Sequence, residues 1–261
     1  MNWLDLPLWL ATLGAEVVLS GLLVRGRVYK LLPVFSLYVG WTIVSDVGMM
    51  TVQRQLSASY FRIYDIELIL DSVLQLAVLV ELAWSVLRPL QSALPRWTAP
   101  VIAVLLLIAG VVVWPIAGTT VMHGLPWEWH YILRLRQTSS ILQVLFFVGL
   151  AAGSQMFSIS WRDRELQVAT GLGFYSLVNL AVSLLHAQMP VVSHTYHRLD
   201  QALSIGYLCS VAYWAVSFAQ KEAPRQEFKP EMRNFLLTVS GAARTGRIAL
   251  QDNRLHGNGP R

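Results

Sequence analysis

The stretch YDIELILDSVLQLAVLVELAW, from Tyr64 to Trp84, decides how this chain folds. It is long enough to cross a bilayer, which takes about 20 residues of helix, and most of it is apolar. Five acidic or amide residues interrupt it: Asp65, Glu67, Asp71, Gln75 and Glu81. At about 100° per residue, the last four share about one third of the helix surface. Because a carboxylate at the bilayer centre costs about 2.5–3.5 kcal/mol on insertion scales, this polar side is predicted to face other helices inside a bundle.

The whole chain has the composition of a membrane protein. Hydrophobic residues make up 55% and charged residues 13% of its 261 residues, whereas soluble domains carry about 25% charged residues. Seven stretches meet the length and hydropathy of a membrane span: 6–24, 31–51, 62–86, 98–117, 135–156, 166–186 and 198–218. We therefore expect an all-α, polytopic bundle of seven transmembrane helices over residues 1–218, surrounded by a lipid bilayer.

Basic residues set the expected orientation. Arg25, Arg27 and Lys30 follow the first stretch rather than precede it, so that stretch is predicted to be an uncleaved helix and not a signal peptide. Placing the amino terminus outside puts most Lys and Arg on the inner side, with the carboxyl terminus in the cytoplasm. Residues 219–261 hold eight Lys and Arg against four Asp and Glu. They are predicted to form a basic, partly disordered cytoplasmic tail, with a short interfacial helix near 230–240, and no nucleic-acid partner is expected.

Polar residues at one level of the predicted bundle form the candidate site. They lie late in the second helix, early in the third and fifth, late in the sixth and early in the seventh: Asp46, Glu67, Asp71, Gln75, Arg134, Arg136, Tyr175, Asn179, His186, His197 and Asp200. We predict a solvated cavity that opens to the outside and is closed beneath by apolar side chains, with Arg134 or Arg136 neutralising Glu67 or Asp71. The alternative is hydrogen bonding that only fixes helix packing, at about 0.6 kcal/mol per bond.

Histidine and cysteine add little specific chemistry. His194 and His197 are spaced to share one helical face, which allows zinc binding, pH sensing or ordinary surface histidines. Nothing else in the sequence supports a metal motif, so no metal, cofactor or catalytic residue is assigned. Cys209 is the one cysteine, so no intrachain disulfide can form.

Two known seven-helix classes can be compared with these residues. Retinal proteins need a lysine in the last helix, but the lysines here are Lys30, Lys221 and Lys229. Zinc hydrolases of the ceramidase and adiponectin-receptor type use a histidine in helix two, an aspartate in helix three and His-x-x-x-His in helix seven. The second stretch here has Asp46 but no histidine, and the seventh has a different spacing. Neither activity is therefore expected.

Short motifs carry a resemblance to a known group of proteins. They are Arg27-x-x-Lys30-x-x-Pro33-x-Phe35-x-x-Tyr38, Tyr60-Phe61-x-x-Tyr64-x-x-Glu67, Arg136-Gln137 and Gly171-x-Gly173-x-Tyr175. Over residues 1–218 the chain resembles bacterial seven-helix integral membrane proteins of unassigned function. The resemblance implies a multi-pass protein of the bacterial inner (plasma) membrane and supplies no substrate. Gly171 and Gly173 would also permit close helix packing.

The function expected from these features is that of a sensor or receptor-like module. It would bind a small molecule in the outer cavity and pass a helix shift to a separate cytoplasmic protein partner. Glu67, Asp71, Arg136, His186 and Asp200 are the residues expected to contact the ligand or one another. The alternatives are a transporter or proton-coupled carrier, a membrane-embedded metal-dependent hydrolase, and a structural role in the envelope. Enzyme activity is the less favoured interpretation because no nucleophile motif is present.

Overall fold

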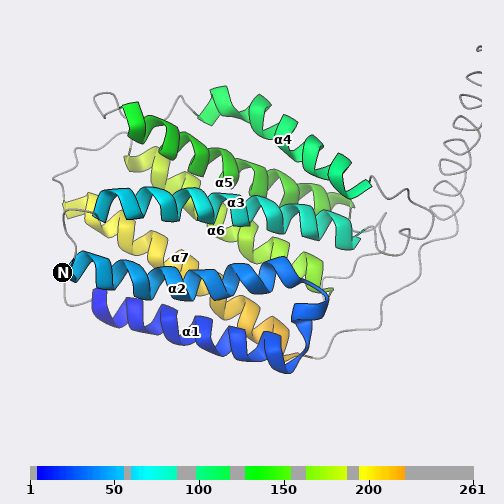
Figure 1. The fold of residues 1–261 in the computed structure, drawn as a ribbon, viewed down its shortest axis with the longest axis horizontal. Coiled ribbons are helices and arrows are strands. Elements are labelled where there is room, and N and C mark those ends of the chain that lie inside the picture. The colour runs from blue at the N-terminus through cyan, green and yellow to red at the C-terminus, as the bar shows by residue number, and fades with distance from the viewer. Residues whose placement is uncertain are drawn as a thin grey trace, which may run out of the picture.

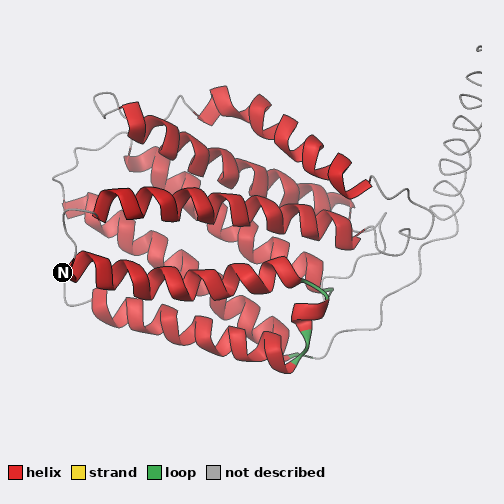
Figure 2. Ribbon diagram, viewed as in Figure 1, coloured by secondary structure: helices red, strands yellow, loops and turns green. Residues whose placement is uncertain are grey.

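In the residues that the computed structural model describes, the chain forms seven long α-helices and one short 3-10 helix (Figure 1). The structure describes residues 5–55, 60–86, 98–117, 127–153, 163–186 and 194–220. The elements are α1 (Asp5–Arg25), η1 (Val28–Lys30), α2 (Pro33–Gln55), α3 (Tyr60–Val86), α4 (Thr98–Ala117), α5 (Trp127–Gly153), α6 (Arg164–His186) and α7 (His194–Ala219). Figure 2 shows that, across these ranges, helices account for nearly all of the chain.

The helices agree with the seven predicted stretches, and the protein is a multi-pass membrane protein. Six of them are long and apolar enough to cross a membrane: α1, α2, α4, α5, α6 and α7. The largest change in boundary is at α5, which begins at Trp127 rather than at residue 135. The predicted interfacial helix near 230–240 and the disorder in the tail lie outside the described residues.

Helix α3 has 27 residues and carries four acidic side chains, Asp65, Glu67, Asp71 and Glu81. Its exposed side chains between Tyr64 and Trp84 are all apolar: Ile66, Ile69, Leu70 and Val73. Its acidic and amide side chains in that range are buried or half-buried. The predicted inward orientation of the polar face is therefore confirmed.

The helices lie side by side, with α4 at the edge of the bundle (Figure 1). α5 packs on α3, α4 and α6, and α7 packs between α1 and α6. The outer surface of α4 carries exposed apolar side chains: Val101, Val104, Leu105, Leu107, Ile108, Val111, Val112 and Ile116. In water such a surface would be unfavourable, but in a membrane it contacts lipid tails of the same polarity.

The main hydrophobic core fills one half of the bundle, near the start of α2 and the ends of α3 and α7. Trp214 is its largest fully buried side chain and meets the ring of Phe35 edge-on, with centroids 5.2 Å apart. Its indole Nε1 donates a hydrogen bond to the carbonyl oxygen of Gln167 at 3.2 Å, so the buried polar atom is satisfied. The ring lies directly against Gly171, where a Cβ atom would overlap it.

A carboxylate from α3 fixes the start of α2. The first backbone N–H groups of a helix have no acceptor within the helix. Pro33, the first residue of α2, has no backbone N–H and so leaves no donor unpaired there. The next two backbone N–H groups, of Val34 and Phe35, donate to the two carboxylate oxygens of Glu81 at 2.7 and 2.8 Å. A negative group is also favourable at a helix amino terminus. Glu81 therefore acts as a cap supplied by a different helix.

Two further polar contacts join helices at this same end. The Arg164 guanidinium, at the start of α6, donates to the carbonyl oxygens of Ser217 and Gln220 at 2.9 and 3.0 Å, so it caps the end of α7. Ser85 on α3 donates its hydroxyl to Glu165 on α6 at 2.7 Å. Helices α2, α3, α6 and α7 are thus tied together around the core.

Close helix packing at glycine predicts a clear difference between two glycine substitutions. A Cβ at Gly173 would lie 2.7 Å from the side chain of Phe147, whereas one at Gly21 meets nothing within 4 Å. Gly173→Ala should therefore lose about 1–3 kcal/mol of stability through overpacking. Gly21→Ala should be neutral or gain up to about 1 kcal/mol from helix propensity. Thermal melting in detergent measures both, and equal melting temperatures would contradict the packing described.

The Glu81 cap predicts a graded loss of stability. Glu81→Ala leaves two backbone N–H groups without an acceptor, and each unpaired buried group costs about 1–3 kcal/mol. Glu81→Gln keeps one acceptor oxygen, so its melting temperature should fall between those of Glu81→Ala and the unchanged protein. If Glu81→Gln and Glu81→Ala melt together, the negative charge rather than the pair of acceptors stabilises this end.

Candidate functional site

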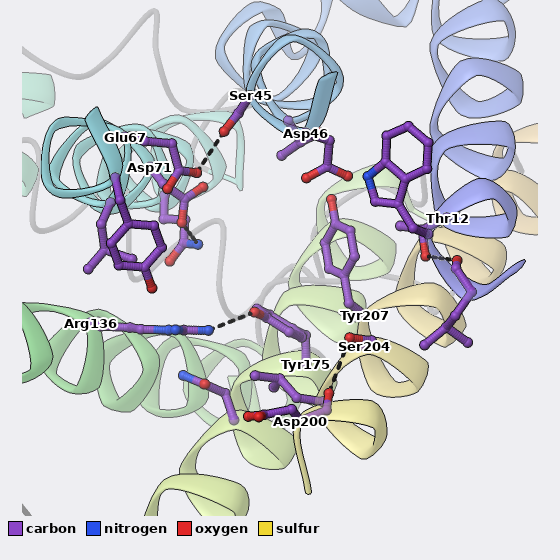
Figure 3. Close-up of a pocket in the computed structure, with 18 of the residues that line it drawn as sticks. Thr12, Ser45, Asp46, Glu67, Asp71, Arg136, Tyr175, Asp200, Ser204 and Tyr207 are labelled. Atoms are coloured by element: carbon purple, nitrogen blue, oxygen red, sulfur yellow. Dashed lines mark hydrogen bonds between the residues drawn. The ribbon is translucent and has the colours of Figure 1, made fainter. Parts of the chain in front are cut away.

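A cavity of about 520 Å³ lies at the end of the bundle where α1 and α7 begin, opposite the main core (Figure 3). Its size is within the range of about 300–1,000 Å³ common for small-molecule sites. Six helices supply its lining: Asp5, Leu8, Trp9 and Thr12 from α1; Tyr38, Trp41, Thr42, Ser45 and Asp46 from α2; Tyr64, Glu67, Leu68, Asp71 and Gln75 from α3; Arg136 and Ser140 from α5; Tyr175 and Asn179 from α6; and His197, Asp200, Gln201, Leu203, Ser204 and Tyr207 from α7.

The acidic wall of the cavity comes from α2 and α3. Glu67, Asp71 and Gln75 are four residues apart and so lie one above another on α3. Glu67 accepts a hydrogen bond from the hydroxyl of Ser45 at 2.7 Å, and Asp71 accepts one from Nε2 of Gln75 at 2.8 Å. Asp46 faces the same space from α2 (Figure 3) and makes no hydrogen bond or ion pair with another residue that the structure describes.

A hydrogen-bonded layer forms the floor of the cavity. Gln143 on α5 donates from Nε2 to Oε1 of Gln75 at 2.6 Å and accepts a hydrogen bond from the hydroxyl of Ser176 on α6. Nε2 of Gln75 also lies 3.4 Å from the hydroxyl of Tyr38 on α2. Four helices meet in this layer. One turn further along α3, Val78, Leu79 and Leu82 are fully buried in apolar clusters, so apolar packing continues beneath the floor.

Arg136 and two tyrosines form the wall opposite the carboxylates. Nη2 of Arg136 donates to the hydroxyl of Tyr175 at 3.5 Å, and Figure 3 shows both side chains directed into the cavity. The rings of Tyr175 and Tyr207 meet edge-on with centroids 5.3 Å apart. The Tyr207 hydroxyl in turn donates to Glu16 of α1 at 2.6 Å, which anchors α7 to α1 beside the cavity.

Histidine–carboxylate pairs lie near the mouth of the cavity. Nε2 of His197 is 3.4 Å from Asp5, which links the starts of α7 and α1. Nε2 of His186, at the end of α6, is 3.7 Å from Asp200. The side chain of Asp200 is 52% exposed, compared with 24% for Asp5. Solvent therefore reaches this end of the bundle more easily than the floor.

The structure brings together most of the site residues predicted from the sequence. Nine line the cavity: Asp46, Glu67, Asp71, Gln75, Arg136, Tyr175, Asn179, His197 and Asp200. Arg134 and His186 do not, although His186 contacts Asp200. Among the described residues no ion pair within 4 Å joins Glu67 or Asp71 to Arg134 or Arg136, although Asp71 and Arg136 attract each other electrostatically, so the predicted neutralisation stays a prediction. Arg136 bonds Tyr175 instead, since its side chain extends from α5 towards α6.

Apart from Asp46 on α2, the contributions of α1 and α2 to the lining were missed. Trp9 and Thr12 are three residues apart, and Tyr38, Trp41 or Thr42, and Ser45 follow the i, i+3, i+4, i+7 spacing of one helical face. That spacing of aromatic and hydroxyl residues was the available signal. It is weak in sequence because these side chains are equally common at helix ends near lipid headgroups.

The acidic lining does not converge on a single point. Across the ranges that the structure describes, no three His, Cys, Asp or Glu side chains are grouped closely enough to hold a metal ion. The five carboxylates that line the cavity instead come from α1, α2, α3 and α7. They therefore line several sides of the same space, with Asp46, Glu67 and Asp71 on neighbouring helices.

The floor of the cavity predicts energetic coupling between α3 and α5. Gln75→Leu and Gln143→Leu each strand the polar partner of the deleted amide. The double variant leaves no amide of this pair unpaired. Its loss of unfolding free energy should therefore be smaller than the sum of the two single losses by about 0.5–3 kcal/mol. A double-mutant cycle of melting temperatures tests this. Gln75→Leu combined with Ser85→Ala, at the far end of α3, is the control, and its stability losses should be additive. If the losses are additive in both cycles, the Gln75–Gln143 contact does not couple α3 to α5.

Comparison with known proteins gives no match for this chain. No protein-family model, curated protein or solved structure is similar to it.

Proposed function

We propose that this protein is a receptor-like membrane module that binds a small molecule in the cavity. The observation that carries the proposal is that the cavity combines charged, hydroxyl and aromatic side chains, is large enough for a ligand, and is closed at one end. Hydrogen-bonded glutamines and then an apolar core lie beneath it. A molecule that enters from the mouth would find polar partners on most sides and would meet a packed barrier at the floor.

The proposal includes α3 as a seventh membrane span. The inward orientation of its polar face supports this, because only apolar side chains of the Tyr64–Trp84 range would meet lipid. Seven spans place the two ends of the bundle's chain on opposite sides of the membrane. The excess of Lys and Arg on one side supports a cytoplasmic carboxyl terminus, with the cavity open to the outside. The resemblance of residues 1–218 supports a bacterial inner membrane as the location.

α3 is the element best placed to carry a signal through the bundle. Near the mouth it bears Glu67 and Asp71, which line the cavity, and at the other end Glu81 and Ser85 bind α2 and α6. Signalling requires two arrangements of the helices in equilibrium. A ligand shifts that equilibrium only if it binds one arrangement more tightly than the other. Axial helix movements of about 1–2 Å are typical of such switches. A movement of α3 would change its contacts at the opposite end, where a cytoplasmic partner could detect it.

The full-length protein in nanodiscs, screened for thermal stability against small metabolites of each charge class, tests the proposal. A ligand at about 100 times its Kd should stabilise the protein by about 2.7 kcal/mol. Asp71→Asn should reduce the shift. Asp65→Asn, the same change on the same helix outside the cavity lining, should leave it unchanged. The absence of any stabilising compound would refute ligand binding.

Flux and pull-down measurements then separate a receptor from a carrier. With the ligand found above, proteoliposomes should show no protein-dependent uptake, because the floor blocks passage. A cytoplasmic protein should copurify with the full chain to a different extent with and without ligand. Uptake that is abolished by Asp71→Asn would favour a carrier over the receptor proposed.

A further inference from the structure

We propose that the ligand of this cavity is a small organic amine, bound with its ammonium group among Asp46, Glu67 and Asp71. This inference rests on the proposed function and gives the chemical class of its ligand. Three features of the lining favour an amine: the excess of negative charge, the unused acceptor capacity of the carboxylates, and the aromatic rings around them.

Negative charge dominates the lining. Among the described residues of the lining, five carboxylates face one arginine, Arg136. Two of the carboxylates, Asp5 and Asp200, lie near histidines at the mouth. The other three are on the α2 and α3 wall, and Arg136 forms no ion pair with them within 4 Å in the part of the chain that the structure describes. Confined to a space with low-dielectric walls, such charges attract a cation and repel an anion.

The carboxylates on this wall keep free acceptor positions. A carboxylate has about four lone-pair sites, and an ammonium group has three N–H donors. Glu67 and Asp71 each accept one hydrogen bond from a neighbouring side chain. Asp46 accepts none from the described residues and faces the centre of the cavity (Figure 3). A primary ammonium group could therefore donate to more than one carboxylate without displacing an existing partner.

Aromatic rings supply the rest of the amine's environment. Trp9, Tyr38, Trp41, Tyr64, Tyr175 and Tyr207 all line the cavity. The faces of such rings attract cations within about 6 Å of the centroid, and they also bury the apolar carbon chain to which an ammonium group is attached. Figure 3 shows Tyr207 projecting towards Asp46, so an aromatic ring and a carboxylate lie beside the same space.

The position of Arg136 bears on whether the ligand is a simple amine or a zwitterion such as an amino acid. An amino acid would place its carboxylate on Arg136 and its ammonium group on the acidic wall. We choose the simple amine because an added carboxylate would enter a cavity that already holds five. The guanidinium can then remain hydrogen bonded to Tyr175.

The test uses three probes that share a phenyl ring and a short chain: 2-phenylethylamine, phenylalanine and 3-phenylpropionate. Binding of each to the full-length protein in nanodiscs is measured by isothermal titration calorimetry and thermal shift. We expect the amine to bind at least about tenfold more tightly than the other two. Tighter binding of the zwitterion or the anion would overturn the amine while leaving a small-molecule receptor in place. Binding of none of the three would overturn the amine proposal, and the broader metabolite screen would then decide the proposed function separately.

Matched variants locate the ammonium group. Asp46→Asn and Asp71→Asn should each weaken amine binding by about tenfold, the loss expected for one charge-assisted hydrogen bond. Asp65→Asn on α3 should not change it. Arg136→Gln should strengthen amine binding, because it removes a repulsive positive charge from the cavity lining. If Arg136→Gln abolishes binding, or if Asp65→Asn weakens it as much as Asp46→Asn, the ammonium site is not the one proposed. If Mg²⁺ alone stabilised the protein as much as 2-phenylethylamine does, the site would bind an inorganic cation, and the amine proposal would likewise be overturned.

Discussion

The hydrogen bond between Gln75 and Gln143 is the contact on which the arrangement of the bundle depends. In a membrane, lipid offers no partner for an amide, so a polar side chain at mid-helix must find one in another helix. Gln75 finds it on α5, and the same amide pair reaches α2 and α6 through Tyr38 and Ser176. The polar face of α3 is therefore held in the interior, Ile66, Ile69, Leu70 and Val73 turn outward, and the space above the layer is left to charged and aromatic side chains.

The two ends of the bundle are built differently. At the core end, Glu81 and Arg164 bind backbone groups at the ends of neighbouring helices, so each contact satisfies atoms that would otherwise be unpaired. At the cavity end, the contacts are between side chains, and several of those side chains are half-exposed. Regions with fewer buried contacts open at lower free energy. The cavity end is thus expected to be the softer of the two, as a site that admits a ligand requires.

Sequence periodicity predicts the helices and much of the site, because both depend on local spacing. The positions of Glu67, Asp71 and Gln75 on one face of α3 follow from helix geometry alone. The partners of those residues do not. Which residue meets Arg136 depends on the rotation of α5 relative to α6, and the partner of Glu81 lies 46 and 47 residues away along the chain. The aromatic lining from α1 and α2 was equally hidden, since a tryptophan facing a cavity and one facing lipid headgroups have the same local sequence signal.

The indoles of Trp9 and Trp41 give the cavity an optical property of its own. Both rings line the space into which a ligand would move, whereas Trp214 is sealed within the core. The emission of an indole depends on the polarity and the quenchers around it, so displacing water from the cavity changes the surroundings of the first two rings and not those of the third. The protein thus carries a built-in fluorophore pair at the site and an internal reference remote from it.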